Sequence, residues 1–489
     1  MTTMNQSAPD EGRVAPKVVE THTAILFFVG EHVYKLKKAV DLGFLDHRDR
    51  EARRACCKRE VELNRRLAPD VYHGVLDLID EAGRPVDHVV DMRRMPDDRR
   101  LSRCIERDED VEPPLRAAAH VLAALHAHGK ADPVHDAEAT RDAVLRRWRD
   151  GFDQVRTLPV GPSAEEGMAR MEDLAVRYLS GRAPLFDERI RRGWIRDGHG
   201  DLQAEDIFLL EDGPRILDCL EFGDEYRWGD VLSDVAFLAM DLERLGRPQL
   251  AQLFLGLHRQ LCADTWPATL ADHYIAYRAH VRAKVEILRS VQHADRSAAS
   301  AGPYIDLANR HLEDAQVRLV VVGGEPGTGK STLAERLGDR LGAVVLRTDE
   351  IRQRMAHPVE IDRYAPEAVT AAYVEMLIEA RRLVGLGEHV ILDATWTSQA
   401  HRSMARSAAA ECAADLIELR CTLPRLVADE RIRRRQSEGT DASEATVEVA
   451  TLLAARFERW PEATEVPTQG SPEDVADLAA ATILRLSRR

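Results

Sequence analysis

The first part of the chain alternates short apolar segments with polar turns. Two such segments, Ala24–Val29 and His32–Lys38, flank Gly30-Glu31, and this arrangement predicts a tight β-hairpin. Residues Arg50–Leu67 carry apolar side chains at helical spacing. From about 96 to 312 helical patterns dominate, interrupted by a strand–turn–strand segment at Ile207–Leu217. The pattern predicts a strand-rich region followed by a larger helical one.

The pattern changes at Val317–Val322, a compact apolar strand that alternating strands and helices follow to the C-terminus. Such alternation is typical of a parallel, doubly wound sheet. We therefore predict a disordered lead-in over residues 1–17 and a first domain over 18–312. Its small lobe covers about 18–95 and its helical lobe about 96–312, and a second domain covers 313–489.

Composition narrows the class of protein. The chain has 489 residues, of which 44% are apolar and 31% charged, an ordinary soluble composition for more than one domain. Acidic residues outnumber lysine and arginine by 83 to 68, which argues against a nucleic-acid partner. No apolar run approaches the roughly 18 residues of a membrane span, and residues 1–17 lack the apolar core of a secretory signal. The seven cysteines include no CxxC pair, so we expect reduced thiols in a cytoplasmic protein without a membrane partner.

A glycine-rich motif follows the strand at Val317–Val322 directly. Residues Gly324–Ser331 match GxxxxGK(S/T) in full, and the helix-forming segment Leu333–Leu341 comes next. In such a loop, backbone N–H groups surround phosphate oxygens, the lysine neutralises phosphate charge and the hydroxyl binds Mg²⁺. The predicted nucleotide-binding residues are Gly324, Gly327, Thr328, Gly329, Lys330, Ser331 and Thr332, of which Lys330 is also catalytic and Ser331 also a Mg²⁺ ligand.

Two carboxylates are expected beside this loop. Asp349 follows the predicted strand Val344–Arg347, and Asp393 follows the predicted strand at 389–392. Because the carboxyl ends of parallel strands meet at one edge of a sheet, both side chains would project next to the loop. Asp393 fits the role of holding Mg²⁺, and Asp349, with Arg352 one turn later, fits a catalytic acid–base and clamp pair. An Asp here can also simply cap the following helix.

The last third of the chain resembles the small-molecule kinase branch of P-loop proteins, or a related AAA-type ATP-binding domain. The resemblance rests on the glycine-rich loop, on Thr-Asp-Glu-Ile-Arg at 348–352 and on Leu-Asp-Ala-Thr at 392–395. Gluconate and shikimate kinases, zeta toxins and polynucleotide kinases belong to that group. The arginines at 431, 433, 434 and 435, with the segment 440–446, resemble its mobile lid, which closes over the transferring phosphoryl group. The resemblance implies that Arg431 and Arg435 bind nucleotide; a solvated basic helix face is the alternative.

A second candidate site centres on His199-Gly200-Asp201. Kinase-like catalytic loops read HxDxxxxN, in which the Asp orients and deprotonates the acceptor hydroxyl and the Asn binds a metal. His199 and Asp201 match this pattern, whereas position 206 is Asp. The sequence therefore predicts Asp201 as the general base and Asp206 as a metal ligand.

The hairpin after this loop carries a further carboxylate. If Leu210 pairs with Arg215, then Ile207 pairs with Asp218, and Asp206 and Asp218 converge at the open end of the hairpin. Two converging carboxylates suit Mg²⁺, a hard cation that prefers oxygen ligands. The alternative is an ordinary polar hairpin, because Asp is common in turns.

Two charged residues nearer the N-terminus complete the pattern. Lys35 lies on the second strand of the first predicted hairpin, and Glu60 lies on the helix that follows. In kinase-like folds such a pair aims the lysine at the α- and β-phosphates. Asp230 and Asp234 have the i,i+4 spacing of one helix face, and we interpret them as anchors of the catalytic loop rather than as a metal pair.

Together these segments resemble the aminoglycoside-phosphotransferase-like family over roughly residues 20–312. The resemblance is carried by residues 33–38, 60–67, 218–222 and 230–238 as well as the loop. The family reads His-Gly-Asp-Leu-His-x-x-Asn, from which Gln203 and Asp206 differ. The whole chain resembles a bacterial branch that joins this domain to a P-loop ATPase or kinase. The resemblance implies a bilobal protein-kinase-like fold and a P-loop NTPase fold with a doubly wound parallel sheet.

The sequence thus predicts a phosphotransferase that uses ATP and Mg²⁺ at two sites and phosphorylates hydroxyls of small molecules such as sugars or amino sugars. One alternative is a P-loop enzyme regulated by a kinase-like domain that binds a ligand with little or no catalysis. Another is an aminoglycoside-modifying resistance enzyme, although a fold does not fix a substrate. The sequence makes no prediction of the oligomeric state.

Overall fold

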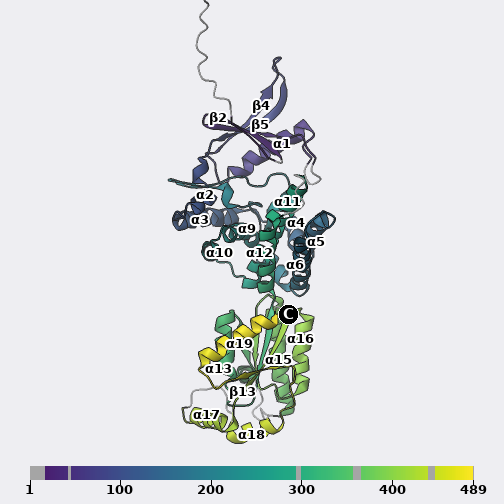
Figure 1. Cartoon of the computed structure of the whole chain (residues 1–489), viewed down its shortest axis with the longest axis vertical. Helices are drawn as coiled ribbons and strands as arrows, with labels where there is room; N and C mark the ends of the chain where they lie inside the picture. Colours follow the sequence, from purple (N-terminus) through teal and green to yellow (C-terminus); the bar gives the residue numbers. More distant parts are fainter. Residues whose placement is uncertain are drawn as a thin grey trace, which may run out of the picture. The chain divides into compact units, whose positions relative to one another are not determined.

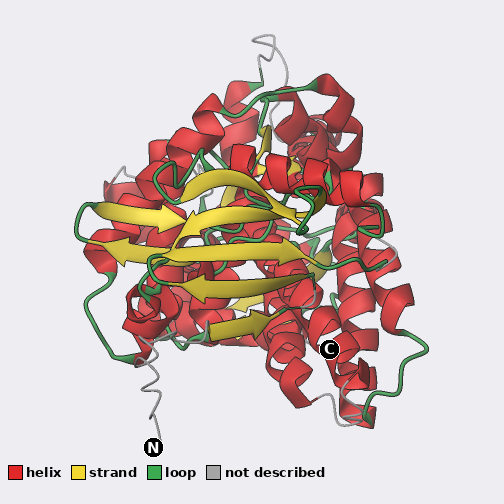
Figure 2. Cartoon of the chain, turned by 90° about the horizontal axis from the view of Figure 1, so that it is seen from above, coloured by secondary structure: helices red, strands yellow, loops and turns green. Residues whose placement is uncertain are grey.

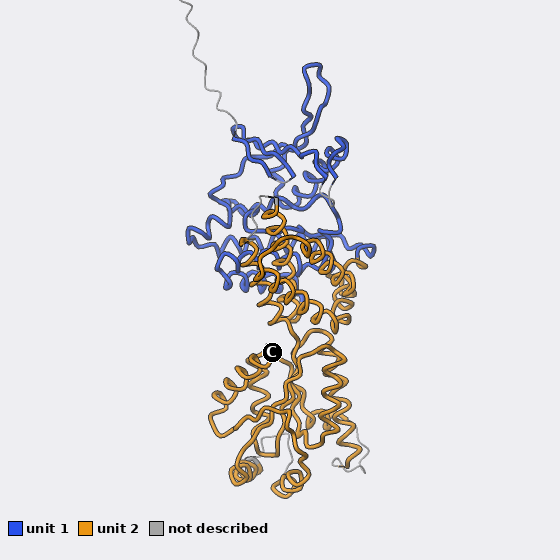
Figure 3. Tube along the Cα trace, turned by 45° about the vertical axis from the view of Figure 1, so that its right-hand side comes forward, with its two compact units in different colours: residues 1–135, 195–264 blue, residues 136–194, 265–489 orange. Residues whose placement is uncertain are grey.

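The structure is a computed structural model of the chain and describes residues 17–21, 23–41, 46–292, 299–355, 365–438 and 446–487. The predicted lead-in lies outside the described residues apart from Lys17. The chain forms two compact units, unit 1 with residues 1–135 and 195–264 and unit 2 with residues 136–194 and 265–489 (Figure 3). Within the described ranges, no helix has both the length and the apolar character needed to cross a bilayer.

Unit 1 contains a five-stranded antiparallel sheet in the order β1-β2-β3-β5-β4 (Figure 1). Its strands are β1 (Lys17–Glu20), β2 (Ala24–Val29), β3 (His32–Lys37), β4 (Tyr72–Ile79) and β5 (Pro85–Arg93). The predicted hairpin is present, with Val29 paired to His32 across a turn in which Gly30 has a φ of 55°. Because side chains alternate along β3, Val33, Lys35 and Lys37 share the face that α1 covers.

Helix α1 (Arg50–Asn64) begins at Asp49, whose carboxylate accepts a hydrogen bond from the backbone N–H of Ala52. It ends three residues before the predicted Leu67. Its apolar side, including Cys57 and Val61, packs against the sheet. This packing places Glu60, on the same helix face, over β3.

The rest of unit 1 is mainly helical. Its elements are η1 (Asp97–Arg99), α2 (Leu101–Glu106), α3 (Glu112–His128), β6 (Ile195–Asp197), η3 (Ala204–Asp206), β7 (Ile207–Leu210), β8 (Gly213–Ile216), α8 (Asp224–Arg227), β9 (Trp228–Asp230), α9 (Val231–Arg244) and α10 (Pro248–Leu261), and α4 (Pro133–Asp136) ends at the boundary of the unit. Helix α9 is buried along most of its length between α10 and the loops before it. A helix that is apolar nearly all round is expected to be buried. It supports the loop at His199–Asp201 through Asp234.

The hairpin of β7 and β8 differs in register from the prediction. Leu210 pairs with Gly213 and Ile207 with Ile216, a shift of two residues. The reason is a two-residue turn at Glu211-Asp212, closed by Gly213 with a φ of 121°, in place of a four-residue loop. The predicted pairing of Ile207 with Asp218 is therefore wrong.

Unit 2 has a helical part and a sheet part. The helical part consists of η2 (Ala137–Ala139), α5 (Arg141–Val155), α6 (Pro162–Ser180), α7 (Ala183–Arg191), α11 (Ala268–Gln292), η4 (Ala299–Ala301) and α12 (Gly302–Ala315). Aromatic rings fill its interior, where His280 stacks on Trp148 and His273 stacks on Tyr178. Figure 2 shows all described helices of the chain in red and all strands in yellow.

The sheet part of unit 2 is a five-stranded parallel sheet in the order β11-β12-β10-β13-β14, which confirms the doubly wound prediction. Its strands are β10 (Arg318–Gly323), β11 (Val344–Arg347), β12 (Val390–Asp393), β13 (Asp415–Thr422) and β14 (Thr464–Pro467). Its helices are α13 (Lys330–Leu341), α14 (Thr348–Arg354), α15 (Pro366–Gly385), α16 (Gln399–Glu411), α17 (Arg425–Glu438), α18 (Val447–Ala455) and α19 (Pro472–Ser487). In Figure 1, α13 and α19 lie on one side of the sheet and α15 and α16 on the other.

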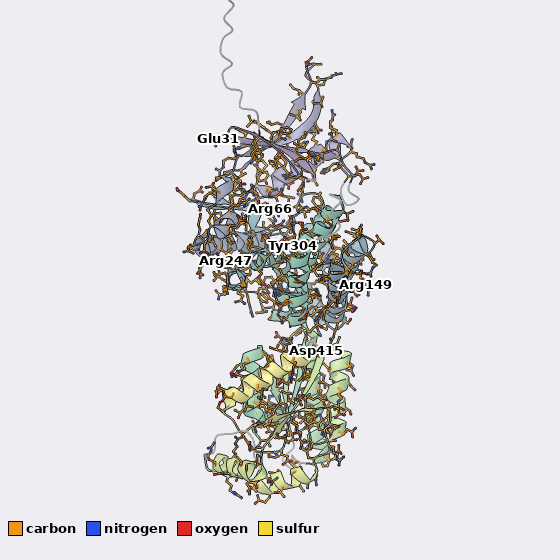
Figure 4. The ribbon with its side chains drawn as sticks, viewed as in Figure 1. Glu31, Arg66, Arg149, Arg247, Tyr304 and Asp415 are labelled. Carbon is orange, nitrogen blue, oxygen red and sulfur yellow. The ribbon has the colours of Figure 1, made fainter. Side chains whose placement is uncertain are left out.

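A buried arginine joins the two parts of unit 2. Arg182, which is 0% exposed, donates to the carbonyls of Val384, Cys412 and Ala413, at the C-terminal ends of α15 and α16. A Cβ on Gly181 would lie 1.9 Å from the carbonyl oxygen of Cys412, so only glycine fits this approach. Nearby, Asp415 (labelled in Figure 4) accepts from Arg177. The predicted domain boundary at 312–313 stays a prediction, and this joint shows that helical residues before it pack with the parallel sheet.

Candidate functional site

The lysine and glutamate of the kinase-like pattern meet in the structure. The Nζ atom of Lys35, on β3, lies 2.8 Å from Oε1 of Glu60, on α1, and 2.7 Å from Oδ1 of Asp218. Glu60 is fully buried. Burial alone would lower the pKa of Lys35, but Asp218 and Glu60 raise it well above its ordinary value. Lys35 is therefore a fixed positive charge at this site.

The loop at His199–Asp201 is held by a buried carboxylate. Asp234, on α9, accepts hydrogen bonds of 2.8 Å from the backbone N–H groups of both His199 and Gly200. Burial would raise the pKa of Asp234, but hydrogen bonding and charge from His126 and the His199 N–H lower it below its ordinary range. Asp230 instead caps α9 by accepting from the N–H of Leu232. These bonds fix the backbone next to Asp201.

The two predicted metal carboxylates lie together despite the changed register. The N–H of Leu217 donates to the carbonyl of Asp206 at 2.9 Å, which brings Asp206 next to Asp218. Burial, then the charges of Asp218 and Asp201, raise the pKa of Asp206 well above its ordinary value. Lys35, by contrast, lowers the pKa of Asp218 to about 2. The three carboxylates and one lysine thus share a single electrostatic site.

Asp218 adopts a backbone conformation that is rare for residues other than glycine, with a φ of 64°. Neighbouring side chains hold it there. Asn64, on α1, accepts from the N–H of Cys219 at 2.8 Å, and the hydroxyl of Tyr72 accepts from the N–H of Asp218 at 3.2 Å. Strain of this kind persists where the surroundings over-determine the backbone, and it is common at functional sites.

These carboxylates fit Mg²⁺ by their chemistry. In the described part of the chain, no three histidine, cysteine or acidic side chains gather closely enough to hold a metal alone. Asp206 and Asp218 would supply two oxygen ligands, and Mg²⁺ in nucleotide enzymes completes its shell with phosphates and water. The mutual repulsion that raises the pKa of Asp206 is what a bound cation would relieve.

The phosphate loop has the predicted geometry. It joins β10 to α13, and Gly324, Gly327 and Gly329 have φ angles of 144°, 78° and 83°. A Cβ on Gly324 would lie 2.7 Å from the carbonyl oxygen of Cys421, so the backbone passes too closely for a larger residue. The Thr328 hydroxyl donates to the carbonyl of Glu325 at 2.7 Å and fixes the turn. Lys330, Ser331 and Thr332 form the first turn of the helix.

Asp393 and Asp349 lie at the carboxyl edge of the sheet beside this loop. Asp393 ends β12 and is 4% exposed. Burial raises its pKa, and the nearby Lys330, Ser331 hydroxyl and Arg347 oppose that rise. A buried carboxylate beside a serine hydroxyl and a lysine fits the Mg²⁺-holding role. Asp349 lies in the first turn of α14 and pairs with Arg352 rather than capping the helix.

A pocket of about 440 Å³ extends from the phosphate loop toward α17 and the end of β14. Arg431 lines it and donates to the carbonyl of Thr468 at 3.0 Å, and the Thr468 hydroxyl donates to the carbonyl of Thr328 at 2.6 Å. Its other lining residues are Gly327, Gly329, Lys330, Ser331, Thr332, Leu333, Arg434, Gly470, Pro472 and Val475. The side chain of Arg435 and all of the predicted lid segment 440–446 except Thr446 lie outside the described residues.

Several residues at these sites were not predicted from the sequence. Asn64 and Tyr72 support Asp218, and Thr468 supports the phosphate loop. No motif marks them, because each acts through a contact with a segment far away in the sequence. The order of β14 beside β13 is what brings Thr468 to the loop.

Comparisons with known proteins found a family model, curated relatives and solved structures that match this chain. Residues 319–460 match the family AAA_33, described as an AAA domain. Over 465 residues the chain is 42% identical to the uncharacterized protein Rv2004c of Mycobacterium tuberculosis (strain ATCC 25618 / H37Rv), with 93% of each chain covered. A choline/ethanolamine kinase family protein from Mesorhizobium loti aligns over 62% of this chain and 89% of its own, with 12% identity and a TM-score of 0.39. The APS kinase CysC of Mycobacterium tuberculosis, in complex with AMPPNP and APS, aligns over 36% and 99%, with 19% identity and a TM-score of 0.29.

Proposed function

This chain belongs to the same family as Rv2004c of Mycobacterium tuberculosis, and we propose that it is an ATP-dependent phosphotransferase with two nucleotide sites. The observation that carries the proposal is the joining of Lys35, Glu60 and Asp218 in one network, with Asp206 beside them. Kinase-like folds use this set to hold ATP and its metal. The phosphate loop in unit 2 supports a second, independent site.

At the kinase-like site, the chemistry is transfer of the γ-phosphoryl group to a hydroxyl. Lys35 would hold the α- and β-phosphates, and Asp201 would orient the acceptor hydroxyl and take its proton as the oxygen attacks phosphorus. Asp206 and Asp218 would hold Mg²⁺, which neutralises the charge that develops on the phosphates. ADP is the leaving group. We expect the acceptor to be a small molecule.

At the phosphate-loop site, backbone N–H groups and Lys330 would hold the β- and γ-phosphates, and Ser331 and Asp393 would hold Mg²⁺. Asp349 would face the second acceptor and take its proton, with Arg352 as its clamp. The pocket beside Arg431 and Thr468 has room for the rest of the nucleotide. We assign this site to a second small-molecule acceptor or to the product of the first.

The test uses the full chain with single substitutions at each site. Asp201→Ala and Lys330→Ala should each remove one ATP-consuming activity by at least ~10²-fold and spare the other, measured as ADP release against a panel of sugars and amino sugars. Asp212→Ala, in the exposed turn of the β7–β8 hairpin, and Arg336→Ala, on the exposed side of α13, are the matched controls.

The same assay can contradict the proposal. If Asp201→Ala changes no turnover while Lys330→Ala removes all of it, the two-enzyme proposal is wrong. That result would favour a P-loop enzyme controlled by a kinase-like binding domain.

A further inference from the structure

Glu60 is bound by two lysines rather than one. Lys35 approaches its Oε1 at 2.8 Å, and Lys37 approaches its Oε2 at 2.5 Å from the same face of β3. Lys37 is 2% exposed and Glu60 is 0% exposed. A buried charge without a partner costs several kcal/mol, so each of these groups depends on the others. The function proposed above uses Lys35 and Glu60 but not Lys37.

Lys37 has a second partner, Glu221, whose side chain is 10% exposed. Glu221 follows Asp218 by three residues in the same segment. Negative and positive side chains therefore alternate in a line of consecutive ion pairs, from Asp218 through Lys35, Glu60 and Lys37 to Glu221. Burial would lower the pKa of Lys37, but Glu60 and Glu221 raise it, so this lysine stays charged.

This line of charges matters when a nucleotide binds. Phosphates attract Lys35 away from its present contacts, and a metal on Asp218 competes with Lys35 for that carboxylate. If Lys35 were the single lysine bound to Glu60, the buried carboxylate of Glu60 would then lose part of the positive charge that balances it. With Lys37 in place, Glu60 keeps a full ion pair while Lys35 turns to the phosphates.

We propose that Lys37 and Glu221 are positioning residues of the kinase-like site, which hold Glu60 in place and leave Lys35 free to bind phosphate. The proposal rests on the function proposed above. It assigns to Lys37 a contribution to nucleotide affinity without contact with the nucleotide. Lys37→Met would remove the lysine that pairs with both Glu60 and Glu221. Glu60 would then have Lys35 as its remaining lysine partner and would hold it more strongly.

A purely structural ion pair makes a different prediction. Lys37→Met alone leaves Glu221 unpaired and is expected to destabilise the fold. Lys37→Met/Glu221→Gln removes both charges together and is expected to recover most of that stability, as paired removal of buried charges often does. If the pair were only structural, nucleotide binding would recover as well.

The experiment measures Mg²⁺–ATP binding by calorimetry, and unfolding of the nucleotide-free protein by thermal scan, in the full chain. All variants carry Lys330→Ala, so that the remaining binding reports on the kinase-like site. We expect Lys37→Met/Glu221→Gln to unfold near the temperature of its parent but to bind Mg²⁺–ATP at least ~10-fold more weakly. Lys37→Arg, which keeps the charge, should restore the affinity.

Arg53→Met/Asp87→Asn is the matched control, because it removes a largely buried ion pair between α1 and β5 of the same lobe, two helical turns before Glu60 on α1. It should lower the unfolding temperature, because Arg53 also donates to the backbone carbonyls of His47 and Arg48, and it should leave the Kd for Mg²⁺–ATP unchanged. An unchanged Kd in Lys37→Met/Glu221→Gln would overturn the inference alone. Absence of Mg²⁺–ATP binding in the Lys330→Ala parent would overturn the proposed kinase-like site itself, and the inference with it.

Discussion

Replacing Arg182 with methionine tests the joint within unit 2. The side chain keeps its approximate volume but loses the guanidinium, which donates to the carbonyls of Val384, Cys412 and Ala413. The last carbonyls of a helix have no intrahelical partner and carry the negative end of its dipole, so a buried cation suits them well. Burial lowers the pKa of Arg182, so the cost of burying its charge offsets part of the stability that these hydrogen bonds contribute.

The magnitude follows from the three hydrogen bonds between elements. At about 1–1.5 kcal/mol net for each bond, the loss amounts to about 3–4.5 kcal/mol of unfolding free energy for unit 2. Gly181→Ala attacks the same joint sterically, since its Cβ would overlap the carbonyl of Cys412. Arg191→Met, at the end of the helix that Arg182 precedes, is the control; it removes an exposed pair with Glu188, which is worth less than about 1 kcal/mol.

Urea unfolding followed by segment-resolved hydrogen exchange measures the effect. In Arg182→Met, amides at the C-terminal ends of α15 and α16 should exchange faster, and the transition of unit 2 should move to lower urea. If Arg182→Met changes the free energy of unfolding no more than Arg191→Met does, the hydrogen bonds of Arg182 do not stabilise unit 2.

Two further predictions concern charge. Asp206→Asn removes a carboxylate whose pKa is raised by burial and by Asp218 and Asp201, so the nucleotide-free chain should unfold at a higher temperature and gain less stability from Mg²⁺–ATP. Thermal scans with and without Mg²⁺–ATP test this, with Asp212→Asn as the control. A lower unfolding temperature of the nucleotide-free variant would contradict the prediction. His273 and His280 are buried, and burial lowers the pKa of each to about 3. Above about pH 6.5 both rings are neutral in the folded and in the unfolded protein, whereas below that pH they take up protons only in the unfolded protein. The unfolding free energy of unit 2 should therefore fall by about 1.4 kcal/mol per pH unit per ring between about pH 6.5 and 3. His280→Phe should reduce this slope and the exposed His120→Phe should not; equal slopes in the two variants would refute the assignment.

The sequence by itself determined the features that depend on neighbouring residues. The phosphate loop is contiguous, and its glycines adopt the left-handed φ angles that the motif requires. The hairpin at Gly30 and the parallel sheet follow from local apolar periodicity. The order of Lys35, Glu60 and Asp201 along the chain was enough to predict a kinase-like site, because that order reflects one fixed topology.

Only the tertiary structure decided which distant groups meet. The register of the β7–β8 hairpin depends on a turn geometry that the sequence allowed in two forms, and the structure uses the shorter turn. Lys37 and Glu221 are separated by 184 positions, and no local pattern relates them. Arg182 similarly reaches carbonyls more than 200 residues away. Contacts of this kind are set by how helices and sheets pack, and a buried charge identifies its partner only when that packing is known.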